Sequence, residues 1–432
     1  MTDDKPAATP HRAMLFGILA GAVLGLAASE LVRRDILDSE VVGYVTDYAA
    51  YPVGQIFLRL LFMLAVPLIF SALVTGIAEL DPRALGRLGL RTLGYTALVS
   101  TISVLIGLAL VSLLEPGRGD NEELIQLAAE LAKGRPPIEV AKGTGITGIV
   151  SMIPTNPIAA IASGDMLGLI VFSLAIGIGL AVVRTDNTAR LRETIAGLNE
   201  VTMHLIALVM RIAPLGVAGL LFASFATLGV DLLGKIAGYV GVVVLALALH
   251  MFGTYSVILR LVARRSPFRF FRDIRLAIAT AFATSSSSAT LPTTLRVADE
   301  ELRLPRNVSR FVLTAGASMN QNGTALFEGV TVLFLAQVFG VELTLAQSGV
   351  VMLICILGGI GTAGIPGASL PVIAMMMAMY GVPAEGLALI LGVDRFLDMC
   401  RTTVNVAGDL VVAACVAPRE HAAPHSGSPS PS

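Results

Sequence analysis

Charged residues are scarce in this chain of 432 residues, at 14% of the sequence, whereas hydrophobic residues make up 55%. Soluble domains carry about a quarter charged residues, so the composition excludes an ordinary soluble protein and indicates an integral membrane protein. The net charge is −1, and no basic tract with interleaved aromatic residues occurs. We therefore expect no nucleic acid among the partners of this chain.

Cysteine is also rare, with three residues at positions 355, 400 and 415, all in apolar surroundings. Their spacing fits neither a disulfide framework nor a zinc site, so we expect no disulfide, no redox role and no covalently bound cofactor. The first apolar run, which continues to Ser29, lacks the small-residue pattern of a signal-peptide cleavage site. We interpret it as a first spanning helix that follows a short N-terminal segment, residues 1–12.

Long uncharged runs predict the membrane spans. They lie at 13–29, 60–78, 92–114, 143–164 with 166–183, 212–230, 236–259, 276–295, 311–327 and 343–384. Most match the 17–25 residues that cross a bilayer as a helix. The last run, as one helix, would measure about 63 Å, roughly twice the hydrocarbon thickness. It must turn back, and its glycine-rich middle, 358–369, with a single proline, predicts a non-helical tip between two helical arms.

A second interrupted segment occurs earlier in the chain. The run 276–295 centres on four consecutive serines and a proline, Ser285 to Ser288 and Pro292. Serine hydroxyls can satisfy backbone groups that a broken membrane helix leaves free, or can bind a ligand. We therefore predict a second re-entrant tip here.

Arginine placement predicts the orientation in the membrane. Arginines mark alternate loops, around positions 12, 83–91, 184–192 and 260–275, whereas the loop 115–142 is mostly acidic. The positive-inside rule places the first set in the cytoplasm and 115–142 outside, so both termini are expected to be cytoplasmic and the protein to lie in the inner (cytoplasmic) membrane. The tail 417–432 is rich in Pro, Ser and His and is expected to be disordered.

Segment 392–409 places charges of both signs in an apolar stretch. On a helix, one arc of about 100° holds the polar positions. These are Asp394, Asp398, Arg401, Thr402, Asn405 and Asp409. Each charge at mid-membrane costs about 2.5–3.5 kcal/mol on insertion scales, so the set requires mutual pairing, a ligand or ions. A purely structural ion-pair helix is the alternative interpretation.

Two interrupted segments beside this polar helix predict a transporter site at mid-membrane. Helix N-termini and free backbone amides at the tips suit an anionic group, while carbonyl, Asp and Asn oxygens suit a hard monovalent cation.

Four motifs together resemble the dicarboxylate/amino acid:cation symporters, the glutamate transporter family. They are SSSSATLP at 285–292, MNQNGTALFEG at 319–329, GTAGIPG at 361–367 and DRFLDMCRTTVNVAGD at 394–409. Further resemblance lies in IFLRLLFMLAVPLIFS at 56–71 and PTNP at 154–157, so it covers nearly everything from 13 to 416.

The resemblance implies an all-α polytopic membrane protein with eight transmembrane helices, two re-entrant hairpins and inverted repeats. It also implies a homotrimer that works as an elevator. The fixed scaffold, or trimerisation domain, would comprise 13–80 and 143–230. The mobile transport domain would comprise 85–115 and 231–416, with hairpins at about 268–298 and 343–384. Membrane lipid and a small acidic molecule are the expected partners.

By resemblance, Arg401 binds the side-chain carboxylate of the substrate, a task that its planar fork suits. Asp398 takes the amino group, which makes aspartate or glutamate the expected substrate, because dicarboxylate carriers of the family generally lack this Asp. The remaining substrate-binding positions are Ser286, Ser287, Ser288, Thr324, Thr362, Gly364, Pro366, Gly367, Thr402 and Asn405. Two plainer interpretations stay open: Thr324 bonds its own helix, and one of the serines only solvates the bend.

Sodium ions, or protons, are the expected coupling ions. One sodium site of the family matches the carbonyl of Gly316 with Asn320, Asn405 and Asp409, and a single carboxylate suits a monovalent ion. A second site would use carbonyls near Ser318 and Thr362.

A third sodium site is weakened in this chain. By resemblance, Asn322 stands where the family usually has Asp. On the third spanning helix, Thr96 and Val99 stand where relatives carry Tyr and Thr, so Ser100 is the position that still matches. We therefore expect fewer coupled sodium ions than in relatives that carry three, or a proton in place of one.

Two further charged positions keep two interpretations each. Arg395 either pairs with Asp394 or is solvated at the cytoplasmic side. Glu328 is either a proton carrier or hydrogen-bonded structure. His204 and His250 are interpreted as packed residues.

Two other functions are alternatives to the transport of an acidic amino acid. A proton- or sodium-coupled carrier of C4-dicarboxylates such as succinate, fumarate or malate is the alternative transporter. An intramembrane hydrolase that uses Asp394 and Asp398, or one of the serines, is disfavoured, because no His or Lys base lies near the serines in sequence and the two arginines hold the carboxylates ionised. We expect a transporter and not an enzyme.

Overall fold

The computed structural model describes residues 9–78, 86–119, 153–163, 166–228, 231–361, 369–383 and 386–417. All regular secondary structure in these ranges is helical, which confirms the all-α prediction. The helices before the serine segment are α1 (Thr9–Arg33), α2 (Ser39–Val45), η1 (Thr46–Ala50), α3 (Tyr51–Ala78), α4 (Gly86–Leu114), α7 (Pro157–Ser163), α8 (Met166–Val182), α9 (Asp186–Leu228), α10 (Asp231–Ala248), η2 (Leu249–Thr254), α11 (Tyr255–Ile258), η3 (Leu259–Ala263) and α12 (Pro267–Asp273). Those that follow are α13 (Arg275–Thr284), α14 (Ser287–Glu300), α15 (Arg306–Met319), α16 (Asn322–Val338), α17 (Leu345–Gly361), α18 (Ser369–Met379) and α19 (Leu387–Val416).

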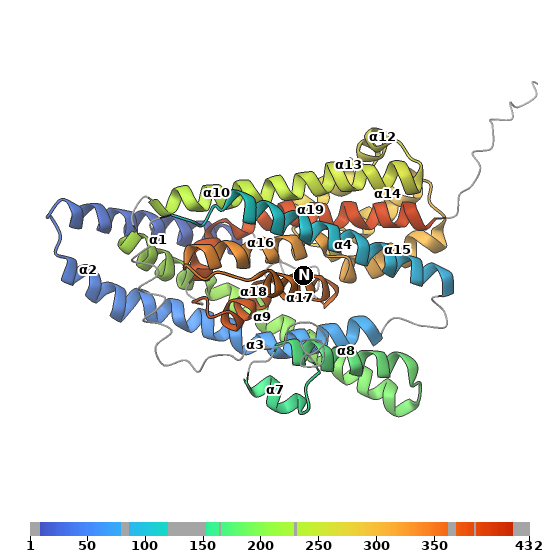
Figure 1. Ribbon diagram of the computed structural model, residues 1–432, viewed down its shortest axis with the longest axis horizontal. Helices are drawn as coiled ribbons and strands as arrows, with labels where there is room; N and C mark the ends of the chain where they lie inside the picture. The colour runs from blue at the N-terminus through green and yellow to red at the C-terminus, as the bar shows by residue number, and fades with distance from the viewer. Residues whose placement is uncertain are drawn as a thin grey trace, which may run out of the picture.

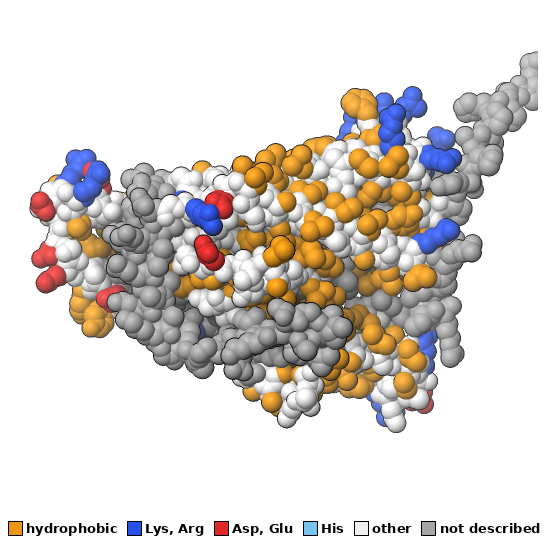
Figure 2. All heavy atoms as spheres, viewed as in Figure 1, with side chains coloured by type: hydrophobic (Ala, Val, Ile, Leu, Met, Phe, Trp, Pro, Cys, Tyr) orange, Lys and Arg blue, Asp and Glu red, His pale blue; other side chains and the backbone are white. Residues whose placement is uncertain are grey.

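Three helical stretches in the described residues are long and apolar enough to cross a membrane: Leu88–Leu114, Gly234–Ala263 and Leu389–Val416. A fourth results if the two halves of α9, which meet at an angle of 51°, count as one span. Figure 2 shows most of the charged side chains toward the two ends of the long axis, one smaller group of both signs nearer the middle, and hydrophobic side chains over much of the described surface between the ends. This distribution suits a protein surrounded by lipid.

One group of helices consists of α1, α3, α8 and α9. Helix α9 packs along both α1 and α3, and α8 packs on α3. Gly17 and Gly21 permit the close approach of α1 to α9, because a Cβ atom at either position would overlap the backbone of Pro214 or Ala218. Small residues at such contacts are typical of membrane helix pairs.

The other group surrounds α19. Helices α10, α13, α14, α15 and α16 all pack against α19, and α4 packs along α16 (Figure 1). Helices α17 and α18 pack on α16 and so belong to this second group. The two groups meet where α17 and α18 contact α3, and where α19 contacts α9. The helix predicted to carry the site therefore lies at the centre of the second group.

The serine segment interrupts the helix at the position that the sequence predicts. Helix α13 ends at Thr284, and α14 begins at Ser287. Ser285 between them adopts the left-handed conformation, with φ of 52°, and extended Ser286 accepts a hydrogen bond from the backbone of Ala289 at 3.2 Å. Serine is a favoured residue at such a helix start, because its oxygen satisfies a free backbone N–H.

A second interruption lies between α15 and α16, which both pack against α19. Asn320 and Gln321 leave the helical conformation, so α15 and α16 are separate helices. The predicted glycine-rich tip, 362–368, lies outside the described residues, but both of its arms are helical, as α17 and α18. The Sγ atom of Cys355 lies 3.9 Å from the Sδ atom of Met376, so the two arms touch at this point.

Several helices are longer than the uncharged runs. Helix α1 begins at Thr9 instead of residue 13, because Pro10 is tolerated in a first helical turn. The helix predicted at 60–78 is continuous with α2 and η1 from Ser39. Polar residues at helix ends lie beyond the apolar layer, so an uncharged run underestimates helix length. Most of segments 1–12 and 417–432 lies outside the described residues.

Candidate functional site

The polar face of α19 is buried. Its members, Asp394, Asp398, Arg401, Thr402, Asn405 and Asp409, are each at most 7% exposed. One continuous helix carries all six, so the helical spacing predicted from the sequence applies. Buried polar side chains need partners, and those partners divide the face into two ends.

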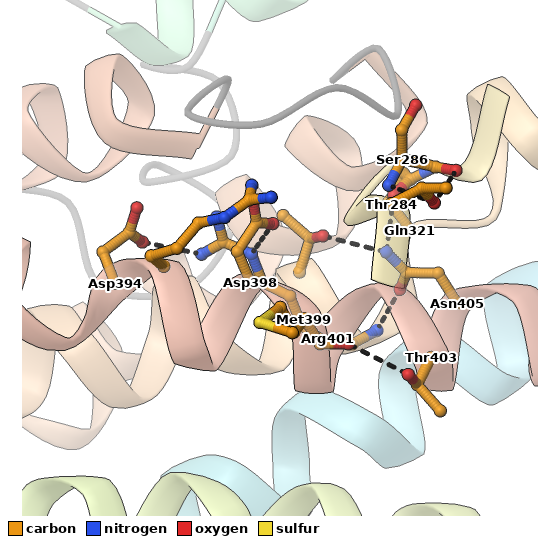
Figure 3. A network of polar contacts seen from close by, with 12 residues as sticks. Thr284, Ser286, Gln321, Asp394, Asp398, Met399, Arg401, Thr403 and Asn405 are labelled. Atoms are coloured by element: carbon orange, nitrogen blue, oxygen red, sulfur yellow. Dashed lines mark hydrogen bonds and ion pairs between the residues drawn. The ribbon is translucent and has the colours of Figure 1, made fainter. Parts of the chain in front are cut away.

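At the first end, Arg401 is held by two carboxylates (Figure 3). Its Nε donates a hydrogen bond to Oδ1 of Asp398 at 2.9 Å, and its Nη1 donates to Oδ1 of Asp394 at 3.2 Å. The guanidinium carbon lies 4.2 Å from the ring centroid of Phe327 on α16. Arginine over an aromatic face gains a further attraction, which is stronger where water is excluded.

A second arginine joins the same cluster. Nη1 of Arg395 lies 3.8 Å from Oδ2 of Asp398, and this side chain is 27% exposed. Asp394 forms its ion pair with Arg401, and Arg395 also attracts Asp394 electrostatically. Two acidic and two basic groups make the cluster neutral overall, which reduces the cost of keeping it in the protein interior.

In the middle of the face, Asn405 ties α19 to the start of α16. Its Nδ2 donates to Oε1 of Gln321 at 2.6 Å and to the hydroxyl of Thr324 at 3.0 Å. Its Oδ1 accepts the backbone N–H of Gly323 at 2.7 Å. A Cβ atom at Gly323 would stand 2.6 Å from the carbonyl of Arg401, so this approach requires glycine. The Thr324 hydroxyl therefore faces the site and not only its own helix.

At the second end, Asp409 accepts a hydrogen bond of 2.8 Å from Nδ2 of Asn320. A Cβ atom at Gly316 would overlap this carboxylate, so α15 and α19 are in close contact here. No Lys or Arg in the described residues lies within ion-pairing distance of Asp409. A buried carboxylate with only neutral partners is costly unless a proton or a cation joins it.

Asn322 continues the network of neutral groups. Its Nδ2 donates to Oδ1 of Asn320 at 3.2 Å, and its Oδ1 lies 2.9 Å from the hydroxyl of Tyr255. The hydroxyl of Ser103 donates to the backbone carbonyl of Asn322 at 2.9 Å. Ser100, the oxygen-bearing position expected at this site, is buried one turn earlier on α4.

A small cavity adjoins Asp409. Its volume is about 40 Å³, and α4, α15 and α19 line it, with the oxygen-bearing side chains of Thr92, Thr96, Asn320 and Asp409 among otherwise apolar residues. This volume exceeds the roughly 10–15 Å³ that one water requires by this measure. A small hydrated species can therefore fit beside the carboxylate.

Several buried oxygen atoms at the interruptions and inside α16 have no hydrogen-bond partner within the described part of the chain. They belong to Ser285, Ser287, Glu328 and Ser369. Ser369 begins α18, next to the tip that lies outside the described residues. Unsatisfied buried polar groups are uncommon in folded proteins, and a missing ligand is one explanation for them. Ser286 is half-buried and Ser288 is exposed.

Some predicted site residues cannot be placed. Thr362, Gly364, Pro366 and Gly367 lie outside the described residues. For Ser318 the structure describes the helical backbone in α15 but not the side chain.

Sequence reasoning missed four contact residues. Ser103, Tyr255, Gln321 and Phe327 all touch the polar network. Gln321 and Phe327 lie inside the motif at 319–329, and their position beside Asn320 and Thr324 was a usable signal. Ser103 and Tyr255 come from distant spanning helices, and the sequence contains no comparable signal for them.

The interpretation of the histidines as packed residues is confirmed for His250 and wrong for His204. His204 is exposed. His250 is completely buried, with its ring 4.6 Å from that of Tyr255, but neither ring nitrogen has a hydrogen-bond partner in the described residues. It is therefore packed without being satisfied, and its ring meets that of Tyr255 in a T-shaped contact.

Comparisons with known proteins identify the family of this chain. Residues 11–418 match the model of the sodium:dicarboxylate symporter family. The chain is 32% identical to the proton/glutamate-aspartate symporter of Escherichia coli (strain K12), over 95% of this chain and 91% of that protein. It is 33% identical to excitatory amino acid transporter 4 of Mus musculus, over 85% and 77%, and 32% identical to the proton/sodium-glutamate symport protein of Bacillus subtilis (strain 168), over 84% of each.

Because the family model spans nearly the whole chain and includes every polar residue of α19, the match covers the site as well as the fold. The members of this family are transporters, so the hydrolase alternative fails. The chain belongs to the sodium:dicarboxylate symporter family of membrane transport proteins.

Proposed function

We propose that this protein is a secondary active symporter that moves aspartate or glutamate across the cytoplasmic membrane, driven by a gradient of sodium ions or protons. The observation that carries the proposal is the adjacent pair Asp398 and Arg401, both buried on α19 with their side chains 2.9 Å apart. A zwitterion with a second carboxylate offers one partner to each of these groups. Relatives that are 32% identical to this chain are symporters of glutamate or aspartate, which supports the same substrate class.

Substrate binding then works by an exchange of partners. Without substrate, Asp394 and Asp398 neutralise Arg401. The side-chain carboxylate of the substrate binds the guanidinium, whose planar fork can hold a carboxylate through two parallel hydrogen bonds. The ammonium group binds Asp398 in place of the arginine. Each buried charge keeps a partner throughout, which avoids the cost of an unpaired ion.

Neutral groups complete the pocket. Thr402 and Asn405 orient the α-amino and α-carboxylate groups, and Thr324 lies within reach through its bond to Asn405. Ser286 to Ser288, together with the backbone of Thr362, Gly364, Pro366 and Gly367, close the pocket from the two tips. The unsatisfied hydroxyls of Ser285, Ser287 and Ser369 support ligand contacts in this region.

The coupling ions bind at the other end of the same face. Asp409, Asn320, Asn405 and the carbonyl of Gly316 hold one cation, and carbonyls near Ser318 and Thr362 hold a second. Charge balance supports this number. Acidic substrate brings one net negative charge to a neutral cluster, and Asp409 adds another, so two monovalent cations neutralise the loaded site.

A third sodium ion has no comparable support. Asn322 offers an amide where a carboxylate would be needed, and its polar atoms already bond Asn320 and Tyr255. Glu328, buried and without a hydrogen-bond partner in the described residues, is the remaining acidic group that can carry a proton.

We further propose an elevator mechanism with eight spanning helices and two re-entrant hairpins, as the family resemblance implies. The packing of the helices into two groups supports the division into a fixed part and a moving part. The group formed by α1, α3, α8 and α9, within 13–80 and 143–230, is the scaffold that forms a homotrimer. The group around α19, within 85–115 and 231–416, carries the site and moves, with hairpins at about 268–298 and 343–384. Both termini face the cytoplasm, as the arginine-rich loops predict.

Uptake of radiolabelled acids into proteoliposomes tests the proposal, with sodium and proton gradients imposed separately. We expect gradient-driven uptake of aspartate or glutamate, with weaker competition by succinate, fumarate or malate. The substitution Asp398→Ser should lower amino acid uptake by about 100-fold or more, because the ammonium group loses its partner. Succinate binding should change little.

The control is Asp299→Ser, an acidic residue on α14 that bonds Ser309 and lies outside the site. If Asp398→Ser left aspartate uptake intact, or if succinate alone were transported, the alternative of a C4-dicarboxylate symporter would replace this proposal.

A further inference from the structure

A dense arginine surface lies where the span Gly234–Ala263 ends. Segment 260–275 contains six arginines against one acidic residue, a net charge of +5, whereas the whole chain carries −1. Five of the six are exposed: Arg260, Arg264, Arg269, Arg272 and Arg275. We call these five residues the arginine surface. Figure 2 shows Lys and Arg side chains gathered where Figure 1 places α12. Arg272 is partly compensated by Asp273, at 3.3 Å.

Exposed hydrophobic side chains continue directly from this surface. Phe252, Val257 and Leu261 are 59%, 55% and 71% exposed along the same helix that ends beside Arg264. Phe268 in α12 is 82% exposed and lies next to Arg269 in sequence. We call Phe252, Val257 and Leu261 the apolar strip. It lies along the span that ends at the arginine surface.

The exposure of Phe268 is specific to that residue. Phe270 in the same short helix is 2% exposed, and Phe271 packs edge-to-face on Phe252 with ring centroids 5.4 Å apart. Two of the three phenylalanines thus anchor α12 to the protein, while the third points away from it. An outward aromatic ring between arginines is typical of a segment that lies at a membrane interface.

The arginine surface is fixed to the helices that carry the serine interruption. Arg265, the half-buried sixth arginine, donates from Nη1 to the carbonyl of Leu302 at 2.9 Å, between α14 and α15. Helix α12 also packs on α13. A ligand on the arginine surface therefore contacts the same packed unit as α13 and α14.

We propose that the arginine surface binds the headgroup of an anionic phospholipid, with its acyl chain along Phe252, Val257 and Leu261 and its interfacial region against Phe268. Guanidinium groups pair with phosphate through several parallel hydrogen bonds, and a juxtamembrane basic cluster attracts anionic lipids by about 1 kcal/mol per residue. A free phosphate ion would use the arginines but not the adjoining apolar strip. The strip therefore commits the site to a lipid.

The chain contains no tryptophan, so one substitution gives a site-specific reporter. The full-length Phe268→Trp protein is reconstituted into vesicles that contain brominated phosphatidylglycerol, or brominated phosphatidylcholine, at the same mole fraction. Bromine quenches tryptophan only at close range. We expect binding of phosphatidylglycerol near residue 268 to be preferred by about tenfold, and this preference to fall as salt screens the charges.

Two charge-matched variants in the Phe268→Trp background locate the site. Arg264→Gln with Arg269→Gln should reduce the preference to less than about twofold. Arg184→Gln with Arg190→Gln removes two arginines from another loop of the same expected side and should leave the preference unchanged. If the first pair prevents insertion into vesicles, Arg272→Gln with Arg275→Gln serves in its place.

Three results would overturn the proposal. These are equal quenching by the two brominated lipids, a preference that survives loss of Arg264 and Arg269, and a preference abolished by millimolar inorganic phosphate at constant ionic strength. The last would assign the arginines to a soluble anion. None of these readouts depends on transport, so the lipid site stands or falls separately from the proposed symport.

Discussion

The two ends of the polar face of α19 manage buried charge in different ways. At one end, Asp394, Asp398, Arg395 and Arg401 neutralise one another through ion pairs of 2.9–3.8 Å. At the other end, Asp409 is bonded to the neutral amide of Asn320. An ion-paired end can exchange partners with a zwitterionic substrate at little cost in unpaired charge. A single carboxylate among amides attracts a cation instead.

The comparison gives each end a separate role within one helix. Asn405 stands between them and bonds Gly323, Gln321 and Thr324. Loss of charge balance at the ion-paired end should therefore affect substrate binding first. Loss of the charge at the Asp409 end should affect cation binding first. The following substitutions separate the two roles.

The largest effect is expected from Arg401→Ala. It removes the substrate carboxylate's partner and leaves Asp394 and Asp398 buried without their main counter-ion, a loss of about 3–5 kcal/mol in comparable buried pairs. Uptake of aspartate should become undetectable. Arg401→Lys keeps the charge without the fork and should retain a small fraction of uptake. Substantial uptake by the alanine variant would show that the ion-paired end does not bind substrate.

Asp409→Asn should come next, because it removes the charge at the cation end but preserves the shape of the side chain. We expect uptake to fall by about tenfold to 100-fold, which corresponds to roughly 1.4–2.7 kcal/mol, and its dependence on the driving cation to weaken. Cation titration of initial uptake rates measures both. An unchanged cation dependence would exclude Asp409 as a ligand.

The smallest effect is expected from Asn322→Asp, which adds a carboxylate to the amide network. The new charge should raise the apparent affinity for sodium by about threefold to tenfold, because a second carboxylate is then close to the cation. Tyr255→Phe is a useful companion, since it removes one hydrogen bond to Asn322, worth about 1 kcal/mol, without adding charge. If only Tyr255→Phe changed sodium affinity, the hydrogen-bond network and not the missing carboxylate would control it.

Much of this fold and site could be predicted from the sequence. Three features depend on residues that are close together in the chain. They are the uncharged runs, the serine interruption at Ser285 and the helical spacing of Asp394 to Asp409. Local sequence determines such features, because helix breaks and helix faces are set within a few residues. The match of α19 to a family motif then supplied the roles proposed for its side chains.

The remainder depends on contacts between distant segments. Ser103 and Asn322 are 219 positions apart, and Tyr255 and Val404 are 149 apart, so no local pattern indicates that they touch. The choice between Arg395 and Arg401 as partner of Asp394 depends on side-chain direction, which spacing alone leaves open. His250 illustrates the same limit, because its lack of polar partners is a property of the packed interior.

The ratio of cations to substrate tests the account most directly. Reversal potentials of aspartate flux, measured in proteoliposomes at varied sodium and proton gradients, give the number of each ion moved per substrate. We predict that aspartate moves with fewer than three sodium ions. A proton supplies any further positive charge that moves with the substrate. Coupling to three sodium ions, with no effect of the Asn322→Asp substitution, would contradict it.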